Sequence, residues 1–204
     1  MSDVAAAGQP VGLRELKKAR TRAAIREQAL RLFREQGYGV TTVEQIAAAA
    51  EVSPATFFRY FPTKEDVVLQ DDFDLVTIGA LEAQPADLSP IAAFRAAAAE
   101  QLAAMTAADR ERLAETTRLT AEIPEVRARA IDEFTRTIDG ISAALARRAG
   151  REPDDFALRT LAGAVLGVIM SATMPFDATT AADVPEMFER IDRALAQLEA
   201  GLPV

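Results

Sequence analysis

Four side chains close together in the sequence have the chemistry needed to contact nucleic acid. Ala55, Thr56, Arg59 and Tyr60 lie on the face of a predicted helix opposite Phe57. A methyl group can contact thymine, a guanidinium group matches the O6 and N7 acceptors of guanine, and a hydroxyl or phenol group can reach a base or a phosphate. This face therefore predicts contact with the base edges and the backbone of duplex DNA.

The segment that carries these residues has clear helix boundaries. Ser53 followed by Pro54 gives a helix cap with proline at the first helical position. Pro62 ends the helix, because the residue before a proline is pushed out of the α region. We therefore expect a short helix over residues 54–60.

A second short helix precedes this one. Residues 42–50 form an apolar helical pattern that Thr41 or Thr42 can cap, and residues 51–53 form the turn between the two helices. Two short helices joined by such a turn are a candidate helix-turn-helix. A longer amphipathic helix over residues 16–36 comes before both of them.

Charge is distributed unevenly along the chain. The total is 31 acidic and 23 basic residues, net -8, yet residues 1–66 carry +2 and residues 67–204 carry -10. Residues 14–34 alone hold eight basic and two acidic side chains. A positive head on an acidic body is expected if the head meets an anion such as DNA; a solvated helix face is the alternative.

The composition excludes several kinds of chemistry. With no cysteine and no histidine, the chain has no disulfide, thiol nucleophile, zinc finger or iron–sulfur cluster, and it lacks the commonest general base. A hard-cation site made of carboxylates alone stays open. Acidic residues such as Glu115, Glu122 and Asp132 form no catalytic motif, and no nucleotide-binding loop is present. We therefore predict a protein that is not an enzyme, with no cofactor and no metal.

The stretch from Ile25 to Glu65 resembles the DNA-binding domain of the tetracycline-repressor (TetR) family. The resemblance rests on Ile25–Phe33, Gly37-Tyr38, Thr41–Ala47 and Val52–Glu65. The match runs continuously through these segments, with no insertion or deletion. It implies a bacterial, sequence-specific transcriptional regulator, typically a repressor that a ligand releases from a palindromic operator, acting as a homodimer. The DNA contacts that it implies are made by Thr42, Val43, Ser53, Pro54, Ala55, Thr56, Phe58, Arg59, Tyr60 and Lys64.

Two of these positions need comment. Phe58 departs from the family pattern, in which this position is commonly tyrosine, so one hydrogen bond to phosphate is in doubt. Arg59 is the strongest candidate for direct base readout, with a phosphate contact as the alternative.

The predicted fold class is all-α, with an N-terminal three-helix helix-turn-helix domain, a C-terminal helical domain and about nine helices. The expected organisation is a disordered lead-in over 1–13, the DNA-binding domain over 14–66, and an effector-binding and dimerisation domain over 67–204. The last domain should hold about five helices, near residues 90–105, 108–120, 124–150, 156–174 and 183–198.

The helix over 156–174 is apolar on all sides after Arg159, so both of its faces should be covered. One face can meet the core of its own domain and the other a second copy of the chain; a single buried helix in a monomer is the alternative. The resemblance implies that the last two long helices form the homodimer. The predicted interface residues are Gly163, Gly167, Met170, Phe188, Ile191 and Leu195.

The resemblance also implies a small apolar or amphipathic effector bound between the middle helices. The opening of the chain and the 57–61 segment look similar to a mycofactocin-associated, acyl-CoA-responsive subgroup, so an acyl-CoA is the candidate ligand. A protein in the cytoplasm without membrane contact is expected, and a helical protein-binding module that lost DNA binding is a rival hypothesis. The predicted lining residues are Phe94, Leu102, Met105, Leu113, Thr117, Phe134, Ile138, Val165 and Ile169.

Overall fold

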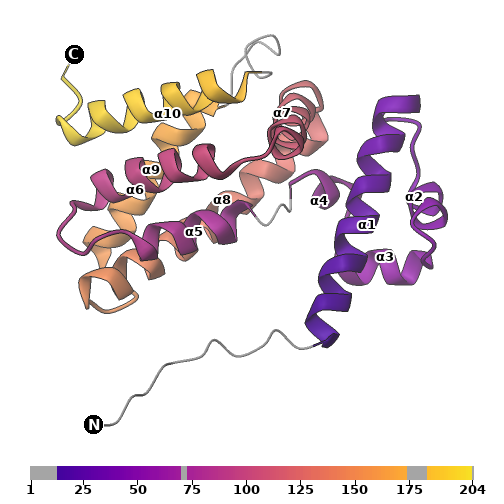
Figure 1. Cartoon of the computed structure of the whole chain (residues 1–204), viewed down its shortest axis with the longest axis horizontal. Coiled ribbons are helices and arrows are strands. Elements are labelled where there is room, and N and C mark those ends of the chain that lie inside the picture. The colour runs from indigo at the N-terminus through magenta and orange to yellow at the C-terminus, as the bar shows by residue number, and fades with distance from the viewer. Residues whose placement is uncertain (1–12, 70–72, 174–182, 204) are drawn as a thin grey trace. The chain divides into compact units, whose positions relative to one another are not determined.

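The structure is a computed structural model that describes residues 13–69, 73–173 and 183–203, so nearly all of the predicted lead-in lies outside it. All regular structure in these ranges is helical, which confirms the all-α prediction (Figure 1). The helices are α1 (Leu13–Gln36), α2 (Val43–Ala49), α3 (Pro54–Tyr60), α4 (Lys64–Leu69), α5 (Phe73–Ala83), α6 (Pro90–Ala104), α7 (Ala107–Glu122), α8 (Pro124–Ala149), α9 (Phe156–Thr173) and α10 (Val184–Glu199).

These ten helices exceed the expected number by one. The sequence analysis placed one helix beginning near Lys64, whereas the described ranges contain both α4 and α5 there. The chain divides into two compact units, Met1–Val67 and Val68–Val204, called here the N-terminal unit and the C-terminal unit.

The N-terminal unit is built around aromatic and aliphatic side chains from its first three helices. Ile25 of α1, Ile46 of α2, Phe57 in the middle of α3 and Phe61 at the C-cap of α3 are fully buried. Burial of a large apolar side chain contributes about 1.5–3 kcal/mol, so these residues fix α3 against the other two helices. The face of α3 opposite Phe57 is consequently left for another partner.

The turn between α2 and α3 uses a left-handed residue. Glu51 has φ +54°, a conformation that L-residues other than asparagine and aspartate seldom adopt. The N–H of Val52 then donates to the Ala47 carbonyl at 2.9 Å, and the N–H of Glu51 donates to the Ala48 carbonyl at 3.1 Å. These bonds close the end of α2 and set the direction in which α3 begins.

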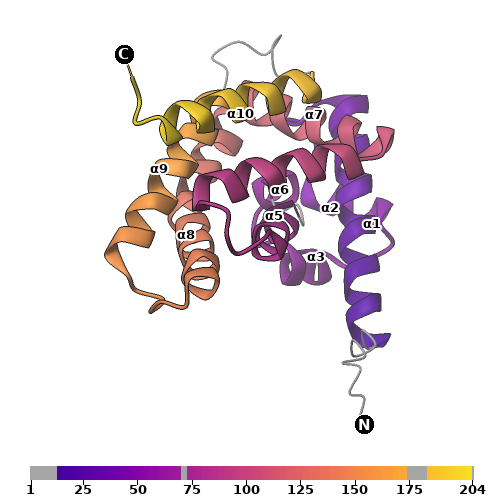
Figure 2. The same ribbon diagram turned by 60° about the vertical axis from the view of Figure 1, so that its left-hand side comes forward.

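The C-terminal unit packs α9 between α8 and α10, while α6 contacts α5 and α10 (Figures 1 and 2). Arg95 of α6 reinforces this packing by donating to both carboxylate oxygens of Asp192 on α10, at 2.7 and 3.1 Å. That bond and the Arg95 charge outweigh desolvation and lower the pKa of the Asp192 carboxyl. The main buried core residues are Leu81, Ala93, Phe94, Ala144, Leu145, Ala162, Val165, Val184, Phe188 and Leu195.

The two faces of α9 differ sharply. Leu158, Ala162 and Val165 are buried in the C-terminal unit, whereas Gly167 and Ser171 are exposed. By length and composition α9 could cross a membrane, and 22% of it is buried. A single such helix is weak evidence for a membrane span, because helices of soluble proteins pass the same test. An apolar helix with one uncovered face is also what a helix-mediated dimer requires.

Candidate nucleic-acid interface and effector cavity

The start of α2 is fixed by a reciprocal cap at Thr42. The Thr42 hydroxyl accepts from the Gln45 backbone N–H at 3.2 Å, and the Gln45 side chain accepts from the Thr42 N–H at 2.9 Å. Gln36, the last residue of α1, donates to the same Gln45 carbonyl at 2.9 Å. Thr42 is nevertheless exposed, with Val43 half-buried behind it, so the positive end of α2 is open to an anion.

The start of α3 is fixed by Ser53, as the sequence predicts. Its hydroxyl accepts from the Thr56 N–H at 3.1 Å and lies 3.0 Å from the Thr56 hydroxyl. Ser53, Pro54 and Ala55 are exposed, and Thr56 is half-buried. The first turn of α3 therefore offers small side chains and hydroxyls where close approach to a base pair needs them.

The second turn of α3 carries the larger groups. Phe58 is 50% exposed and packs edge-on against the ring of Phe57, with centroids 5.5 Å apart. The guanidinium of Arg59 lies 5.3 Å from the centroid of the Tyr60 ring. This contact with the Tyr60 ring leaves the Arg59 side chain exposed, so the N–H donors of Arg59 can reach a partner outside the protein.

Lys64 has partners inside the N-terminal unit. Its ammonium donates to the carbonyls of Tyr38 at 2.9 Å and Thr41 at 3.1 Å, and lies 3.9 Å from the centroid of the Tyr38 ring. The Tyr38 hydroxyl in turn donates to Glu65. We call Tyr38, Lys64 and Glu65 the loop clasp, because they hold the loop between α1 and α2 against the start of α4.

The loop clasp changes the titration of Glu65. Burial acts to raise the pKa of this carboxyl, but hydrogen bonds from Tyr38, Thr63 and the backbone, with the Lys64 charge, outweigh it. The pKa therefore lies below its ordinary value of 4.5, and Glu65 is ionised at neutral pH. The sequence predicted a phosphate contact for Lys64; sequence reasoning did not find its role in the clasp.

A groove runs between the first turns of α1 and the end of α3. It contains Arg59 and Tyr60 from the predicted DNA-contacting set, together with residues of α1 that the sequence analysis did not assign individually. The lining residues are Leu13, Arg14, Lys17, Lys18, Thr21, Arg59 and Tyr60.

The C-terminal unit contains a cavity of about 240 Å³ between α7, α8, α9 and α10. Three of the residues predicted to line an effector site lie in its wall: Leu113, Thr117 and Ile169. The other lining residues, which sequence reasoning missed, are Thr116, Thr120, Ala121, Arg127, Thr173, Met187 and Ile191.

The remaining predicted effector residues lie elsewhere in the C-terminal unit. Phe94 and Val165 belong to the buried core, and Leu102, Met105 and Ile138 pack against that core. Phe134 is half-buried and does not line the cavity. Helical spacing does not distinguish the wall of a cavity from the interior beside it, because both present apolar side chains at the same period.

The residues predicted for the dimer interface divide into two groups. Gly167 is exposed, and Gly163 and Met170 are half-buried, all on α9. The α10 residues, by contrast, are buried within the single chain, where the exposed fractions of Phe188, Ile191 and Leu195 are 5%, 8% and 1%. Only the α9 group is therefore available to a second copy without rearrangement of the core.

An exposed, capped helix-turn-helix on a basic head, joined to an acidic helical body, defines a DNA-binding regulator as the class of protein. The family model for bacterial regulatory proteins of the tetR family matches residues 25–70, and the model for the MftR C-terminal domain matches residues 88–203. The second match covers more than half of the chain. The chain belongs to the TetR family of transcriptional regulators, which are not enzymes.

Individual relatives agree with this assignment. The chain is 49% identical over 88 residues to TcmR of Streptomyces glaucescens, a match that covers 42% of the chain but only 39% of TcmR. It is 27% identical over 159 residues to MftR of Mycobacterium tuberculosis, covering 76% of the chain and 79% of MftR. Thermus thermophilus FadR, a TetR-family repressor solved with lauroyl-CoA, superposes with a TM-score of 0.53 at 29% identity, covering 90% of this chain and 95% of FadR.

Proposed function

We propose that this protein is a sequence-specific repressor that binds a palindromic operator as a homodimer and is released by a small effector. The observation that carries the proposal is the outer face of α3, where Ser53, Ala55, Phe58 and Arg59 are exposed on a helix that Phe57 locks into the unit. A helix that is rigid on one face and open on the other is what major-groove readout requires.

The proposed contacts follow from the chemistry of each residue. Arg59 would donate to a base, most favourably to guanine O6 and N7, while Thr56 and Ala55 would meet base edges. The hydroxyl of Thr42 and the open N-terminus of α2 would lie against a phosphate. Lys64 uses two of its three N–H donors in the loop clasp, which leaves one for a phosphate. The other members of the proposed contact set are Val43, Ser53, Pro54, Phe58 and Tyr60.

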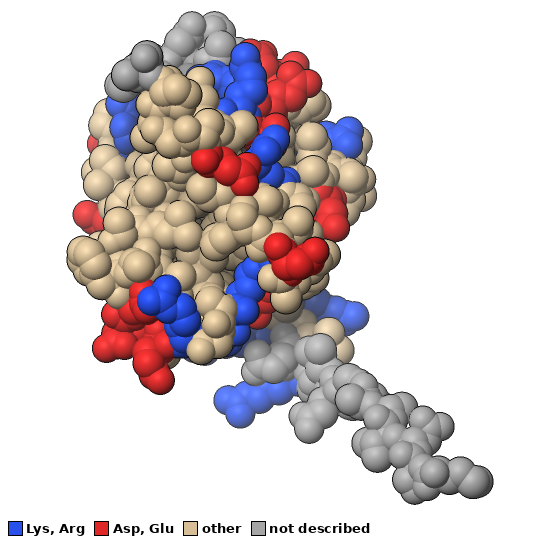
Figure 3. All heavy atoms as spheres, turned by 90° about the vertical axis from the view of Figure 1, so that its left-hand side faces the viewer, with Lys and Arg blue, Asp and Glu red and all other residues tan. Residues whose placement is uncertain are grey.

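The proposed homodimer forms through the uncovered face of α9. Gly167 has no heavy atom within 4 Å of an added Cβ, so its lack of a side chain serves no packing need within the single chain. Small residues allow close approach of helices, and Gly167 and Ser171 would allow it here. Figure 3 shows a broad uncharged area on one face of the C-terminal unit, with charged groups towards its margins. Such a dimer would present two α3 helices to half-sites roughly 34 Å apart.

The proposed effector site is the cavity in the C-terminal unit. The hydroxyls of Thr117, Thr120 and Thr173 donate to carbonyls of their own helices at 2.8–3.0 Å. These threonines can therefore offer a ligand their methyl groups and their hydroxyl oxygens as acceptors. Arg127 supplies a cation to the lining. We infer a small apolar or amphipathic effector, and the lauroyl-CoA held by Thermus thermophilus FadR makes an acyl-CoA the first candidate.

Effector binding would act by favouring a dimer conformation whose two α3 helices no longer match successive major grooves. A ligand can shift DNA binding only by its difference in affinity between the two conformations. Such a regulator would act in the cytoplasm of its host, and the proposal includes no membrane partner.

The experiment is a binding titration with a fluorescent operator obtained by selection from a random duplex library. We expect the wild type to prefer the operator over a scrambled duplex, Arg59→Ala to lose most of that preference, and a saturating cognate acyl-CoA to release the operator. Arg31→Ala is the control, because Arg31 is ion-paired to Glu35 at 2.7 Å on α1. Equal binding of operator and scrambled duplex would overturn the proposal, and binding to neither would favour a protein-binding module.

A further inference from the structure

We propose that the first two turns of α1 form a second DNA-contacting surface beside the recognition helix. This surface would contact the DNA backbone and would not read the base sequence. The inference rests on the proposed function, since it extends the same DNA-binding face. The surface consists of Arg14, Lys17 and Lys18, and we call it the α1 basic stripe.

The α1 basic stripe follows from helical spacing. Positions 14, 17, 18 and 21 are related by three, four and seven residues, which places them on one face of α1. All four line the groove whose other wall is Arg59 and Tyr60 of α3. The stripe is therefore continuous with the outer end of the recognition helix, within one unit of the protein.

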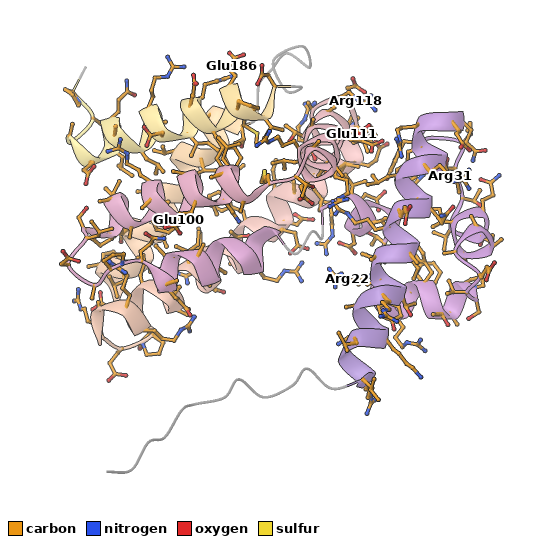
Figure 4. All side chains as sticks on the ribbon, viewed as in Figure 1. Arg22, Arg31, Glu100, Glu111, Arg118 and Glu186 are labelled. Atoms are coloured by element: carbon orange, nitrogen blue, oxygen red, sulfur yellow. The ribbon has the colours of Figure 1, made fainter. Side chains whose placement is uncertain are left out.

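The charges of the stripe are exposed, whereas several basic side chains further along α1 have partners within the protein. Arg14, Lys17 and Lys18 are exposed, and none of the ion pairs found among the described residues involves them. Arg31, by contrast, is paired with Glu35, and Arg26 is buried with its Nε donating to the Val67 carbonyl. Figure 4 shows nitrogen-tipped side chains at the lower, N-terminal end of α1, well below the labelled Arg31. Exposed basic side chains therefore lie where α1 begins.

The dimensions of the stripe fit a nucleic-acid strand. Arg14 and Lys18 are four residues apart, about 6 Å along the helix axis, and one strand of B-DNA advances about 3.4 Å per phosphate along its axis. The stripe thus faces about two phosphates of one strand, within reach of its three cations. Its side chains are long and exposed, which suits contact with the regularly spaced phosphates of a nucleic-acid strand. They are not held in the fixed geometry that a site for a single small anion would need.

The test compares the full-length wild type with the triple variant R14Q/K17Q/K18Q on the selected operator, over a range of salt concentrations. Each phosphate contact contributes about 0.9 to the slope of log K against log salt. We expect the slope to fall by about 2 in the variant and the affinity at 0.1 M salt to fall on the order of a hundredfold. The relative affinities for operators with single base changes should stay as in the wild type, because phosphate contacts carry no base preference.

Two further variants make the result decisive. R14K/K17R/K18R, which keeps the charges, should retain the wild-type slope, and Arg31→Gln should lower it by less than one. An unchanged slope in the triple variant, or a change in base preference with an unchanged slope, would overturn the inference. A wild type that binds operator and scrambled duplex equally would overturn the proposed function instead, while the slope comparison would still decide the role of the stripe.

Discussion

On our proposal, Lys64 has two roles at once, one inside the protein and one towards DNA. Its ammonium donates to two carbonyls of the loop between α1 and α2, and we propose that its remaining N–H meets a phosphate. Loss of DNA binding in Lys64→Ala would therefore have two explanations, a lost contact or a displaced Thr42. Arg59 is the sharper probe, because its one interaction with another side chain among the described residues is the stack on its neighbour Tyr60.

The loop clasp predicts a pH-dependent loss of stability in Tyr38→Phe. The variant removes the hydroxyl that donates to the half-exposed Glu65 carboxylate, and should cost about 1 kcal/mol at pH 7. Because the folded-state pKa of Glu65 is lowered, this stabilisation is present above its unfolded value and is lost as the pH falls through the lower folded value. Urea unfolding at pH 7 and near pH 3 should show the difference shrinking with acidity.

Tyr60→Phe is the matched control for that measurement. It removes the same atom from a residue for which the described structure shows only a ring contact, so its stability should stay within about 0.5 kcal/mol of the wild type. A Tyr38→Phe deficit that is equally large in acid would contradict the role assigned to the Glu65 carboxylate.

Two serines should respond in opposite ways to the same substitution. The Ser142 hydroxyl on α8 belongs to a residue only 2% exposed and has no hydrogen-bond partner among the described residues, so Ser142→Ala should be neutral or stabilise by up to about 1 kcal/mol. Ser53 caps α3, so Ser53→Ala should cost about 1 kcal/mol. Thermal unfolding of both variants checks the pair, and a clear destabilisation by Ser142→Ala would reveal an unseen partner.

Among the helices, α9 has the clearest unmet packing requirement. Its inner face is buried by α8 and α10, and its outer face carries Gly167 and Ser171 in the open. The sequence predicted an apolar helix covered on both sides, and the structure supplies one of the two covers. The second, on our proposal, is the same helix of another protomer.

The dimer proposal predicts that Gly167→Glu separates the protomers without unfolding them. An added side chain has space in the single chain, so helical content and thermal stability of the protomer should be retained, while a charge in a close helix contact should disrupt it. Light scattering should show a monomer, with operator affinity reduced at least tenfold. Ala99→Glu, at an exposed position on α6, is the control and should remain dimeric. A dimeric Gly167→Glu variant would place the interface elsewhere.

The helices illustrate what local sequence signals can predict. Ser53, Ser89 and Asp183 cap their helices through short-range hydrogen bonds, as the sequence indicates, because a cap depends on residues three positions apart. The separate helix α5 was not predicted, since no cap-and-proline signal such as those before α3, α6 and α10 marks its start. Signals of this kind report where a helix begins and say nothing about its partner.

At the scale of the whole molecule, the same limit applies to the residues predicted for the dimer interface and for the effector site. Phe188, Ile191 and Leu195 form a stripe that would suit either a dimer or a core, and the chain uses it for its core. The cavity wall was missed in part because Thr116, Thr120 and Thr173 resemble the solvent side of a helix in sequence. The exposure of the α3 face was easier to predict, because its polar and charged residue types have few uses in a protein interior.

The charge distribution also belongs to this scale. A net charge of -10 on residues 67–204 disfavours unspecific contact with DNA, so the basic head must be directed to its site by base readout and by local phosphate contacts. The proposed regulator therefore requires both a specific base sequence and two-fold symmetry in the DNA that it binds.

Selection of bound sequences from a random duplex library by the purified full-length protein tests that claim most directly. We predict an enriched inverted repeat whose half-site centres lie one helical turn, about 10 base pairs, or a multiple of it apart. Arg59→Ala in the same selection should lose the enrichment. Recovery of an unpaired half-site, or of no preferred sequence at all, would contradict the account of a dimeric, sequence-specific regulator.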